Sequence, residues 1–387
     1  MKITTLKLIN LLFIIIFILF PHSNCFAQNL NTPQQQNEIL EKQFQQSNAN
    51  ELNNAIDEET KKNMESFGVD SPNISVMQNF SIKNFFQFII KKAIQTLKQP
   101  IFIFANCLAI ILITALFENF KPNFNNAELN GVLGIVTALC ICAIIITPII
   151  TTIMSISKTI NLFQKFMLYF IPIFTGTIAM NFKTTTSIGY SSTLFFIAQF
   201  VSAIISNFLL PITSAFLAFS IVGSINSEFK INAITTTVKK IVIFILIFMI
   251  TIFVGLFSIQ TSIAVNADGV AIKTAKFVSG SFIPIIGNAL GEALSSVVGG
   301  LNLIKSAVGG FGILVCLSLL IPPILKIGFF IITISITGAI AKSFKIELID
   351  QTMTSTKDCL SLLLSFLICY GILFISTTAI IINLSAK

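Results

Sequence analysis

Apolar runs of 17 or more residues recur along this chain of 387 residues. Each run can cross a hydrocarbon layer about 30 Å thick as an α-helix, because a helix rises about 1.5 Å per residue. Hydrophobic residues make up 54% of the chain and charged residues 10%, which is too little polar surface for a water-soluble globule. The sequence therefore predicts an all-α fold, a polytopic membrane helical bundle of about eight transmembrane spans, with roughly seven to ten compatible with the pattern.

The charged and catalytic residue types exclude several classes of function. The formal net charge of +8 comes from lysines spread over the chain, and no block is dense enough to follow a nucleic-acid backbone. The single histidine, His22, lies in the predicted export signal, and the chain has neither a Walker loop nor a dinucleotide-binding fingerprint. We therefore predict no enzyme activity, no cofactor, no metal site and no nucleic-acid partner. An ATP-driven step would need another subunit.

Residues 1–27 have the layout of a secretory signal. Two lysines precede an apolar stretch, and a Cys-Phe-Ala sequence with small residues at its first and third positions predicts cleavage between Ala27 and Gln28. The following segment, residues 28–79, is rich in Gln and Asn and is expected to be exported and weakly helical or disordered. Short amphipathic helices that dock a partner and a plain solvated tether both fit it.

An amphipathic helix precedes the first crossing. Over residues 80–99 the apolar side chains share one helical face while lysines and glutamines share the other, which predicts an interfacial helix lying along the membrane. Pro100 is expected to end this helix, because a proline removes a backbone hydrogen bond. The first two transmembrane spans then fall within residues 100–164.

The remainder of the chain is interpreted as two tandem membrane repeats, residues 165–275 and 276–387. Two short motifs recur in the same order, Phe-Ile-Pro-Ile at 170–173 and 282–285 and Phe-Lys-Ile at 229–231 and 344–346. The agreement in order and spacing favours an internal duplication over chance similarity.

Prolines interrupt an apolar segment in each proposed repeat. The predicted helix-break positions are Pro172 and Pro211 in the first repeat and Pro322 and Pro323 in the second. Breaks at matching positions of two halves are how membrane transporters build a path near the midplane. Proline kinks also occur where helices merely pack together, so both interpretations stay open.

Two lysine clusters bear on the orientation of the repeats. They consist of Lys230, Lys239 and Lys240 in the first repeat and of Lys342, Lys345 and Lys357 in the second. An even number of crossings per repeat places both clusters on the cytosolic side and makes the repeats parallel, whereas an odd number inverts one copy. Segments 188–225 and 304–341 each fit either one kinked helix or a short hairpin, so the number of crossings is open.

The stretch from residue 276 to residue 310 combines many glycines with polar residues at membrane depth. A carboxylate in hydrocarbon is costly unless it is paired or hydrated, so Glu292 is expected to face protein or water. The candidate functional or structural residues here are Lys276, Gly280, Pro284, Gly287, Asn288, Gly291 and Glu292. An ion or substrate path, a packed structural hairpin and a glutamate at the membrane interface all fit this pattern.

The same stretch, preceded by Asp268-Gly269-Val270, resembles the signature region of the stage III sporulation protein AE family of endospore-forming bacteria. The resemblance implies a multi-pass membrane subunit of a channel or secretion-like complex that links mother cell and forespore and sustains late forespore development. It implies a location in the mother-cell membrane around the forespore, the outer forespore membrane. The implied partners are other membrane subunits, a separate cytosolic secretion-type ATPase and a forespore protein. The alternative is an independent secondary transporter or permease for a small solute, with Glu292 in its coupling site.

Overall fold

The computed structural model describes residues 34–120, 127–225, 231–282 and 287–384, and the secondary structure within them is entirely helical. The predicted cleavage site at Ala27 and Gln28 lies outside these residues. Four short helices come first: α2 (Gln34–Gln46), η2 (Ala49–Ala55), α3 (Glu58–Glu65) and α4 (Ile74–Gln78). The following elements are α5 (Ile82–Phe120), α6 (Ala127–Met180), α7 (Thr184–Ile204), the π-helical turn η4 (Ile205–Leu209), α8 (Leu210–Ile225), α9 (Ile231–Phe282), α10 (Gly287–Ser343) and α11 (Glu347–Leu384).

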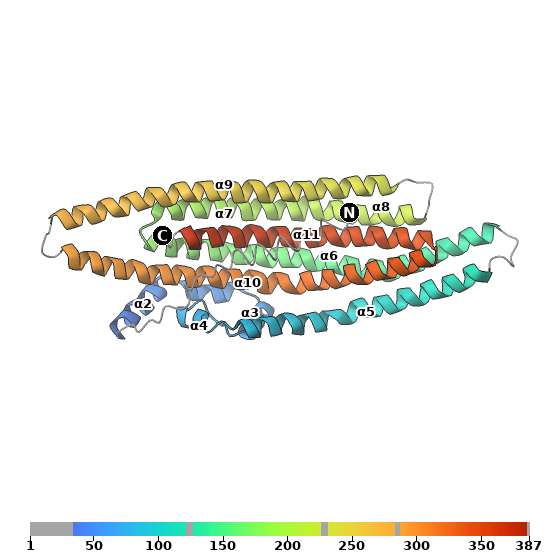
Figure 1. The fold of residues 1–387 in the computed structure, drawn as a ribbon, viewed down its shortest axis with the longest axis horizontal. Coiled ribbons are helices and arrows are strands. Elements are labelled where there is room, and N and C mark those ends of the chain that lie inside the picture. The colour runs from blue at the N-terminus through green and yellow to red at the C-terminus, as the bar shows by residue number, and fades with distance from the viewer. Residues whose placement is uncertain (1–33, 121–126, 226–230, 283–286, 385–387) are drawn as a thin grey trace.

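The long helices lie side by side in an elongated bundle, in which α7, η4 and α8 form a single rod (Figure 1). The axis of the bundle is α11, which packs against α6, α8, α9 and α10. Every residue from 359 to 379 is buried. Leucine, isoleucine and phenylalanine occupy all sides of this helix, as expected for a helix with no face toward solvent.

Aromatic rings join α6 to the central helix. The ring of Phe163 lies 5.0 Å from that of Tyr370 and 5.1 Å from that of Phe374, both in edge-to-face geometry. On the neighbouring helix α10, Gly312 lies so close to the ring of Phe170 that an added Cβ would overlap with it. The glycine therefore sets the close approach of α10 to α6.

The described part of the N-terminal segment is docked on the bundle. The helices α2, α3 and α4 pack on α10, and η2 packs on α6. The fully buried ring of Phe67 contacts Phe80, Phe85 and Phe88, which ties the segment to the start of α5. From Gln34 onward the segment therefore forms short packed helices and is not a solvated tether.

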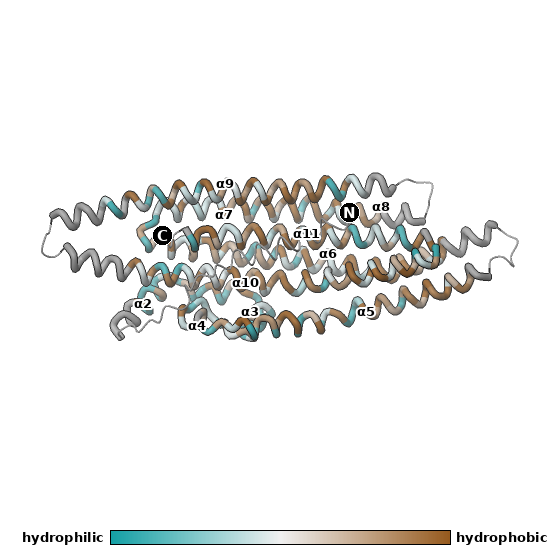
Figure 2. Tube along the Cα trace, viewed as in Figure 1, coloured by the Kyte–Doolittle hydropathy of each residue, from teal (hydrophilic) through white to brown (hydrophobic). Residues whose placement is uncertain are grey.

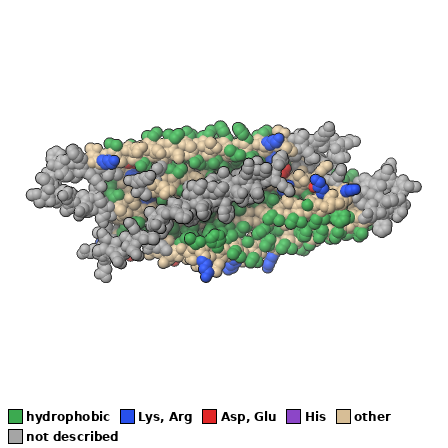
Figure 3. Space-filling model, viewed as in Figure 1, with side chains coloured by type: hydrophobic (Ala, Val, Ile, Leu, Met, Phe, Trp, Pro, Cys, Tyr) green, Lys and Arg blue, Asp and Glu red, His purple; other side chains and the backbone are tan. Residues whose placement is uncertain are grey.

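Six helical stretches among the described residues are long and apolar enough to cross a membrane. They are Ile82–Phe117, Ile135–Met180, Thr184–Phe219, Thr236–Val270, Val298–Ser343 and Leu348–Asn383. Hydrophobic residues follow α9 along most of its described length (Figure 2), and hydrophobic side chains cover α5 and α9 on the face shown in Figure 3. The chain is thus a multi-pass membrane protein, but the predicted eight spans are not confirmed. Segments 188–225 and 304–341 each contribute one crossing instead of a hairpin.

The interfacial helix predicted over residues 80–99 is not a separate element. Residues 82–120 form the single helix α5, and Pro100 lies inside it. The expectation that Pro100 ends the helix is therefore wrong. A proline removes one backbone donor, and the apolar residues on both sides of it still favour the helical state in a membrane protein.

Three of the four predicted helix-break positions also lie inside continuous helices. Pro172 is within α6, and Pro322 and Pro323 are within α10, so the prediction of broken helices is wrong there. Near Pro172, Thr175 Oγ1 donates a hydrogen bond to the Pro172 carbonyl at 3.0 Å. Pro211 differs, because it is the second residue of α8, next to the π-helical turn η4. The irregular backbone is confined to that position of the rod.

The internal duplication stays a prediction. The second Phe-Lys-Ile motif, 344–346, directly precedes α11, and Ile231 of the first motif opens α9, so these copies occupy similar places. The Phe-Ile-Pro-Ile copies do not, because 170–173 lies within α6 whereas Phe282 ends α9. The proposed boundary between residues 275 and 276 also falls inside α9.

The described lysines of both clusters lie at the same end of the bundle. Lys239 of α9 forms an ion pair with Asp358 of α11, next to Lys357. Lys342 and Lys345 lie at the turn from α10 to α11, at that same end (Figure 1). Lys230 is outside the described residues. Both clusters therefore lie on the same side of the bundle, as expected if each proposed repeat has an even number of crossings.

Candidate functional site

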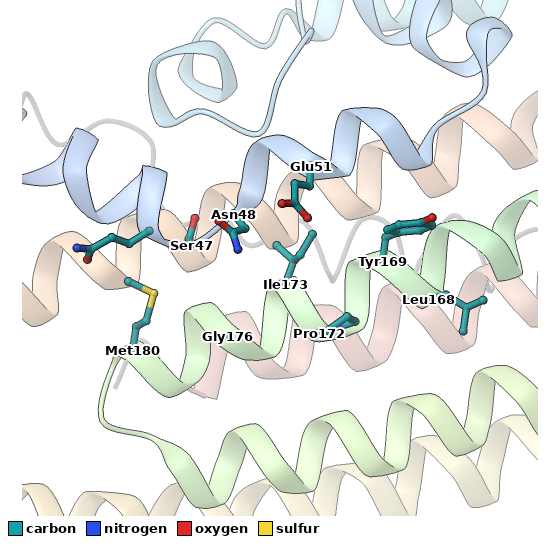
Figure 4. Close-up of a pocket in the computed structure, with 10 residues that line it drawn as sticks. Ser47, Asn48, Glu51, Leu168, Tyr169, Pro172, Ile173, Gly176 and Met180 are labelled. Carbon is teal, nitrogen blue, oxygen red and sulfur yellow. The ribbon is translucent and has the colours of Figure 1, made fainter.

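A cavity of about 430 Å³ lies between the N-terminal segment and α6 (Figure 4). One wall is polar and comes from the turn between α2 and η2, with Gln46, Ser47, Asn48 and Glu51. The other wall is mainly apolar and comes from α6, with Leu168, Tyr169, Pro172, Ile173, Gly176 and Met180. The cavity can accommodate a molecule with a polar and an apolar side. Its volume falls at the lower end of the usual range of small-molecule sites.

Local hydrogen bonds shape the polar wall. Ser47 Oγ donates to the Phe44 carbonyl at 2.6 Å and accepts from the Ala49 backbone N–H at 3.3 Å. Asn48 adopts left-handed backbone angles, with φ at 54°, which asparagine tolerates better than most residues. The sharp turn places Asn48 and Glu51 over the exposed side of α6 (Figure 4). Pro172, predicted as a helix break, instead lines this cavity.

A polar face continues along α6 beside the cavity. Three side chains, Lys158, Asn161 and Lys165, are exposed on this helix, and we call them the α6 polar face. Next to it, Gln164 Nε2 donates to Gln199 Oε1 of α7 at 2.6 Å. The sequence interpretation missed this face. Its signal is the spacing of three polar residues at i, i+3 and i+7 within an apolar helix.

The beginning of α7 is capped by a side chain from a distant helix. Asp268 of α9 accepts hydrogen bonds from the backbone N–H groups of Thr185, at 3.1 Å, and Thr186, at 2.7 Å. The first N–H groups of a helix have no partner within the helix, and a carboxylate also interacts favourably with the positive end of the helix dipole. Lys183 is buried just before this helix. Burial lowers the pKa of Lys183, and the negative charge of Asp268 acts in the opposite direction.

The predicted glycine-rich site lies around the turn from α9 to α10. Lys276 and Gly280 belong to α9, and Gly287, Asn288, Gly291 and Glu292 belong to the first turns of α10. Pro284 and the side chains of Lys276, Asn288 and Glu292 lie outside the described residues, so no common site is described for them. Further along the same stretch Lys305 is fully buried, and its Nζ donates to Asn302 Oδ1 at 3.3 Å.

No metal-binding cluster is found in the described part of the chain. Within it, no three His, Cys, Asp or Glu side chains lie where they could hold a metal ion together. The described residues instead provide a cavity and the α6 polar face. They also place charged groups at two positions, Asp268 at the start of α7 and the Lys239–Asp358 ion pair between α9 and α11. These features suit the binding of a molecule.

Comparison with known proteins gives one family. A family model described as stage III sporulation protein AE matches residues 71–385. A curated relative, stage III sporulation protein AE of Bacillus subtilis (strain 168), is 27% identical over 164 residues, which cover 42% of this chain and 41% of that relative. The chain thus aligns with less than half the length of this relative. No solved structure matches the chain.

Proposed function

Because the chain belongs to the stage III sporulation protein AE family, we propose that it is a membrane subunit of the channel or secretion-like complex that links mother cell and forespore. In this role it is required for late forespore development. It sits in the mother-cell membrane around the forespore. Its partners are other membrane subunits, a separate cytosolic secretion-type ATPase and a forespore protein.

The observation that carries this proposal is the length of the helices. α6, α9 and α10 contain 54, 52 and 57 residues, which corresponds to about 80 Å each at 1.5 Å per residue. A bilayer with its headgroups is about 40–45 Å thick. These helices therefore project well beyond the membrane, and projecting helices provide the surface that a subunit needs to contact neighbours outside the bilayer.

No catalytic step is assigned to this chain. The proposed role is structural and conductive, and the energy of ATP hydrolysis enters through the partner ATPase. A signal sequence cleaved after Ala27 would place the following segment on the far side of the mother-cell membrane, facing the forespore.

The second candidate is an independent secondary transporter for a small solute. The buried Lys305 and the glycine-rich stretch that contains it favour this candidate, because ionisable residues inside membrane bundles often mark ion or substrate paths. In this role Glu292 couples transport to an ion.

A deletion strain separates the two candidates. Arrest of development after engulfment is expected for a subunit of the complex, whereas normal spores with altered uptake of a solute indicate the transporter. Glu292→Gln tests the carboxylate itself, with Glu65→Gln on the exposed side of α3 as the matched control. Unchanged sporulation and solute uptake with Glu292→Gln would remove this residue from either mechanism.

A further inference from the structure

The cavity between the N-terminal segment and α6 is a groove that follows α6. Its floor runs from Leu168 to Met180, which is about 18 Å at a rise of 1.5 Å per residue. Gly176 belongs to this floor, and an added Cβ at this glycine would meet nothing within 4 Å. The free space of the groove therefore lies above the glycine, and its elongated shape suits a hydrocarbon chain.

Apolar side chains of the floor stay accessible beneath the N-terminal segment. Tyr169 is 52% exposed and Leu168 is 46% exposed. A ligand that covers them with an apolar part is stabilised by the hydrophobic effect. Because the chain crosses a membrane, phospholipids are the abundant molecules that carry a long apolar part together with a polar headgroup.

The polar wall of the groove carries one carboxylate. Glu51 is exposed, and its side chain forms no hydrogen bond or ion pair with another described residue. In Figure 4 this side chain points from the turn toward α6, where Tyr169 and Ile173 lie on adjacent turns. A carboxylate and an accessible aromatic ring in one groove suit an ammonium group, which is attracted by the negative charge and by the face of the ring.

A positive charge lies next to the same part of the groove. Lys165 of the α6 polar face precedes Leu168 and Tyr169 by three and four residues, so the three side chains share one side of α6. Lys165 is exposed and forms no hydrogen bond or ion pair with another described residue. It can therefore bind a phosphate group next to Tyr169. Beside the apolar floor, Glu51 and Lys165 provide one partner each for the two charges of a zwitterionic headgroup.

We propose that the groove binds a phospholipid with an ammonium headgroup, such as phosphatidylethanolamine. The ammonium group lies against Glu51 and Tyr169, the phosphate contacts Lys165, and an acyl chain follows the floor past Gly176. A phospholipid without an ammonium group, such as phosphatidylglycerol, leaves the carboxylate of Glu51 without a counter-charge and binds less well. The bound lipid joins the N-terminal segment to α6. The site goes beyond the proposed function and needs no partner subunit.

Fluorescence quenching of a single tryptophan by brominated lipids tests the site. The chain contains no tryptophan, so Tyr169→Trp introduces one fluorophore into the groove and keeps an aromatic ring there. The purified protein is reconstituted in phosphatidylglycerol nanodiscs that contain either brominated phosphatidylethanolamine or brominated phosphatidylglycerol over the same range of mole fractions. Phe248→Trp, on the exposed apolar surface of α9, is the matched control.

Brominated phosphatidylethanolamine should quench Tyr169→Trp with an apparent affinity about threefold or more above that of brominated phosphatidylglycerol. Phe248→Trp should be quenched equally by the two lipids. Adding Glu51→Gln to Tyr169→Trp should remove the difference between the lipids. Adding Gly176→Leu should lower the quenching by both lipids, because the new side chain fills the groove. Gly255→Leu, at a glycine of α9 where an added Cβ also meets nothing within 4 Å, should leave it unchanged.

Equal quenching of Tyr169→Trp by the two lipids would overturn the proposed headgroup, and so would a preference that persists with Glu51→Gln. Displacement of the brominated lipid by free phosphoethanolamine would overturn the lipid as the ligand, because the headgroup alone would then fill the site. Unchanged quenching with Gly176→Leu would overturn the place of the acyl chain. Gly176→Ala, which fills less of the groove, takes the place of Gly176→Leu should that variant fail to accumulate.

Discussion

The backbone N–H of Thr186 donates a 2.7 Å hydrogen bond to the carboxylate of Asp268, which lies 82 residues later in the chain. A helix N-terminus is thus capped by a side chain of another helix, and the cap joins α7 to α9. Asp268→Ala removes both hydrogen bonds to the start of α7 and should lower the free energy of unfolding by about 1–2 kcal/mol. Asp268→Asn keeps a carbonyl oxygen and should cost less.

The measurement is the midpoint of thermal unfolding of the purified protein in detergent. Asp70→Ala is the control, because Asp70 is exposed and lies outside the bundle helices. Equal midpoints for Asp268→Ala and Asp70→Ala would contradict the capping role.

The lowered pKa of Lys183 should make the stability of the protein change with pH in the alkaline range. Its pKa is lower in the folded protein than in the unfolded chain, so its positive charge opposes folding at neutral pH. The stability of the wild type relative to Lys183→Gln should therefore rise as the pH increases from the folded pKa toward the unfolded value of about 10.4. Unfolding midpoints measured at pH 7, 9 and 10 check this. Lys273→Gln, at an exposed lysine of α9, is the control.

The ion pair between Lys239 and Asp358 is largely buried, with side chains 15% and 17% exposed. Removing one partner leaves the other charge without its counter-ion, so Lys239→Met should lower stability by about 2–4 kcal/mol. The double variant Lys239→Met with Asp358→Leu should recover most of this loss, because it removes both charges. The adjacent exposed Lys240→Met is the control. A double variant less stable than either single variant would argue against pairing.

Two glycines of α10 provide a matched pair of substitutions. An added Cβ at Gly312 overlaps with the Phe170 ring, whereas an added Cβ at Gly328 meets nothing within 4 Å. Gly312→Ala should therefore destabilise the bundle by about 1–3 kcal/mol. Gly328→Ala should be neutral or stabilising by up to about 1 kcal/mol, because alanine favours helix over glycine. Thermal midpoints in detergent measure both, and equal effects would show that α10 does not approach α6 closely.

The helical membrane character of the fold could be predicted from the sequence. Runs such as 241–263 are long, apolar and uncharged, and these properties alone favour a spanning helix. The ends of the helices are harder to predict from the sequence. Proline often ends a helix in a water-soluble protein, and the same effect was expected here. Pro100 and Pro172 lie inside continuous helices, since a membrane helix gains little by exposing its backbone groups to an apolar environment.

The candidate site was only partly predictable. Pro172 was selected as a helix break and proves to line the cavity. The cap at Asp268 has no local sequence pattern, because its partners are Thr185 and Thr186, which are brought near only by the packing of α7 on α9. Lys165 entered the sequence interpretation only as the start of a repeat. Its position on one helix face with Lys158 was visible in the sequence, but its exposure beside the cavity depends on how α6 packs in the bundle.

The enclosure of α11 has a consequence for biogenesis. The ribosome makes this helix after α5 to α10, and yet it forms the centre on which α6, α8, α9 and α10 pack. Earlier helices must therefore enter the lipid with their inner faces still unpaired and close only when residues 359–379 arrive. During synthesis these inner faces need a temporary partner, either lipid chains or an insertase that shields them.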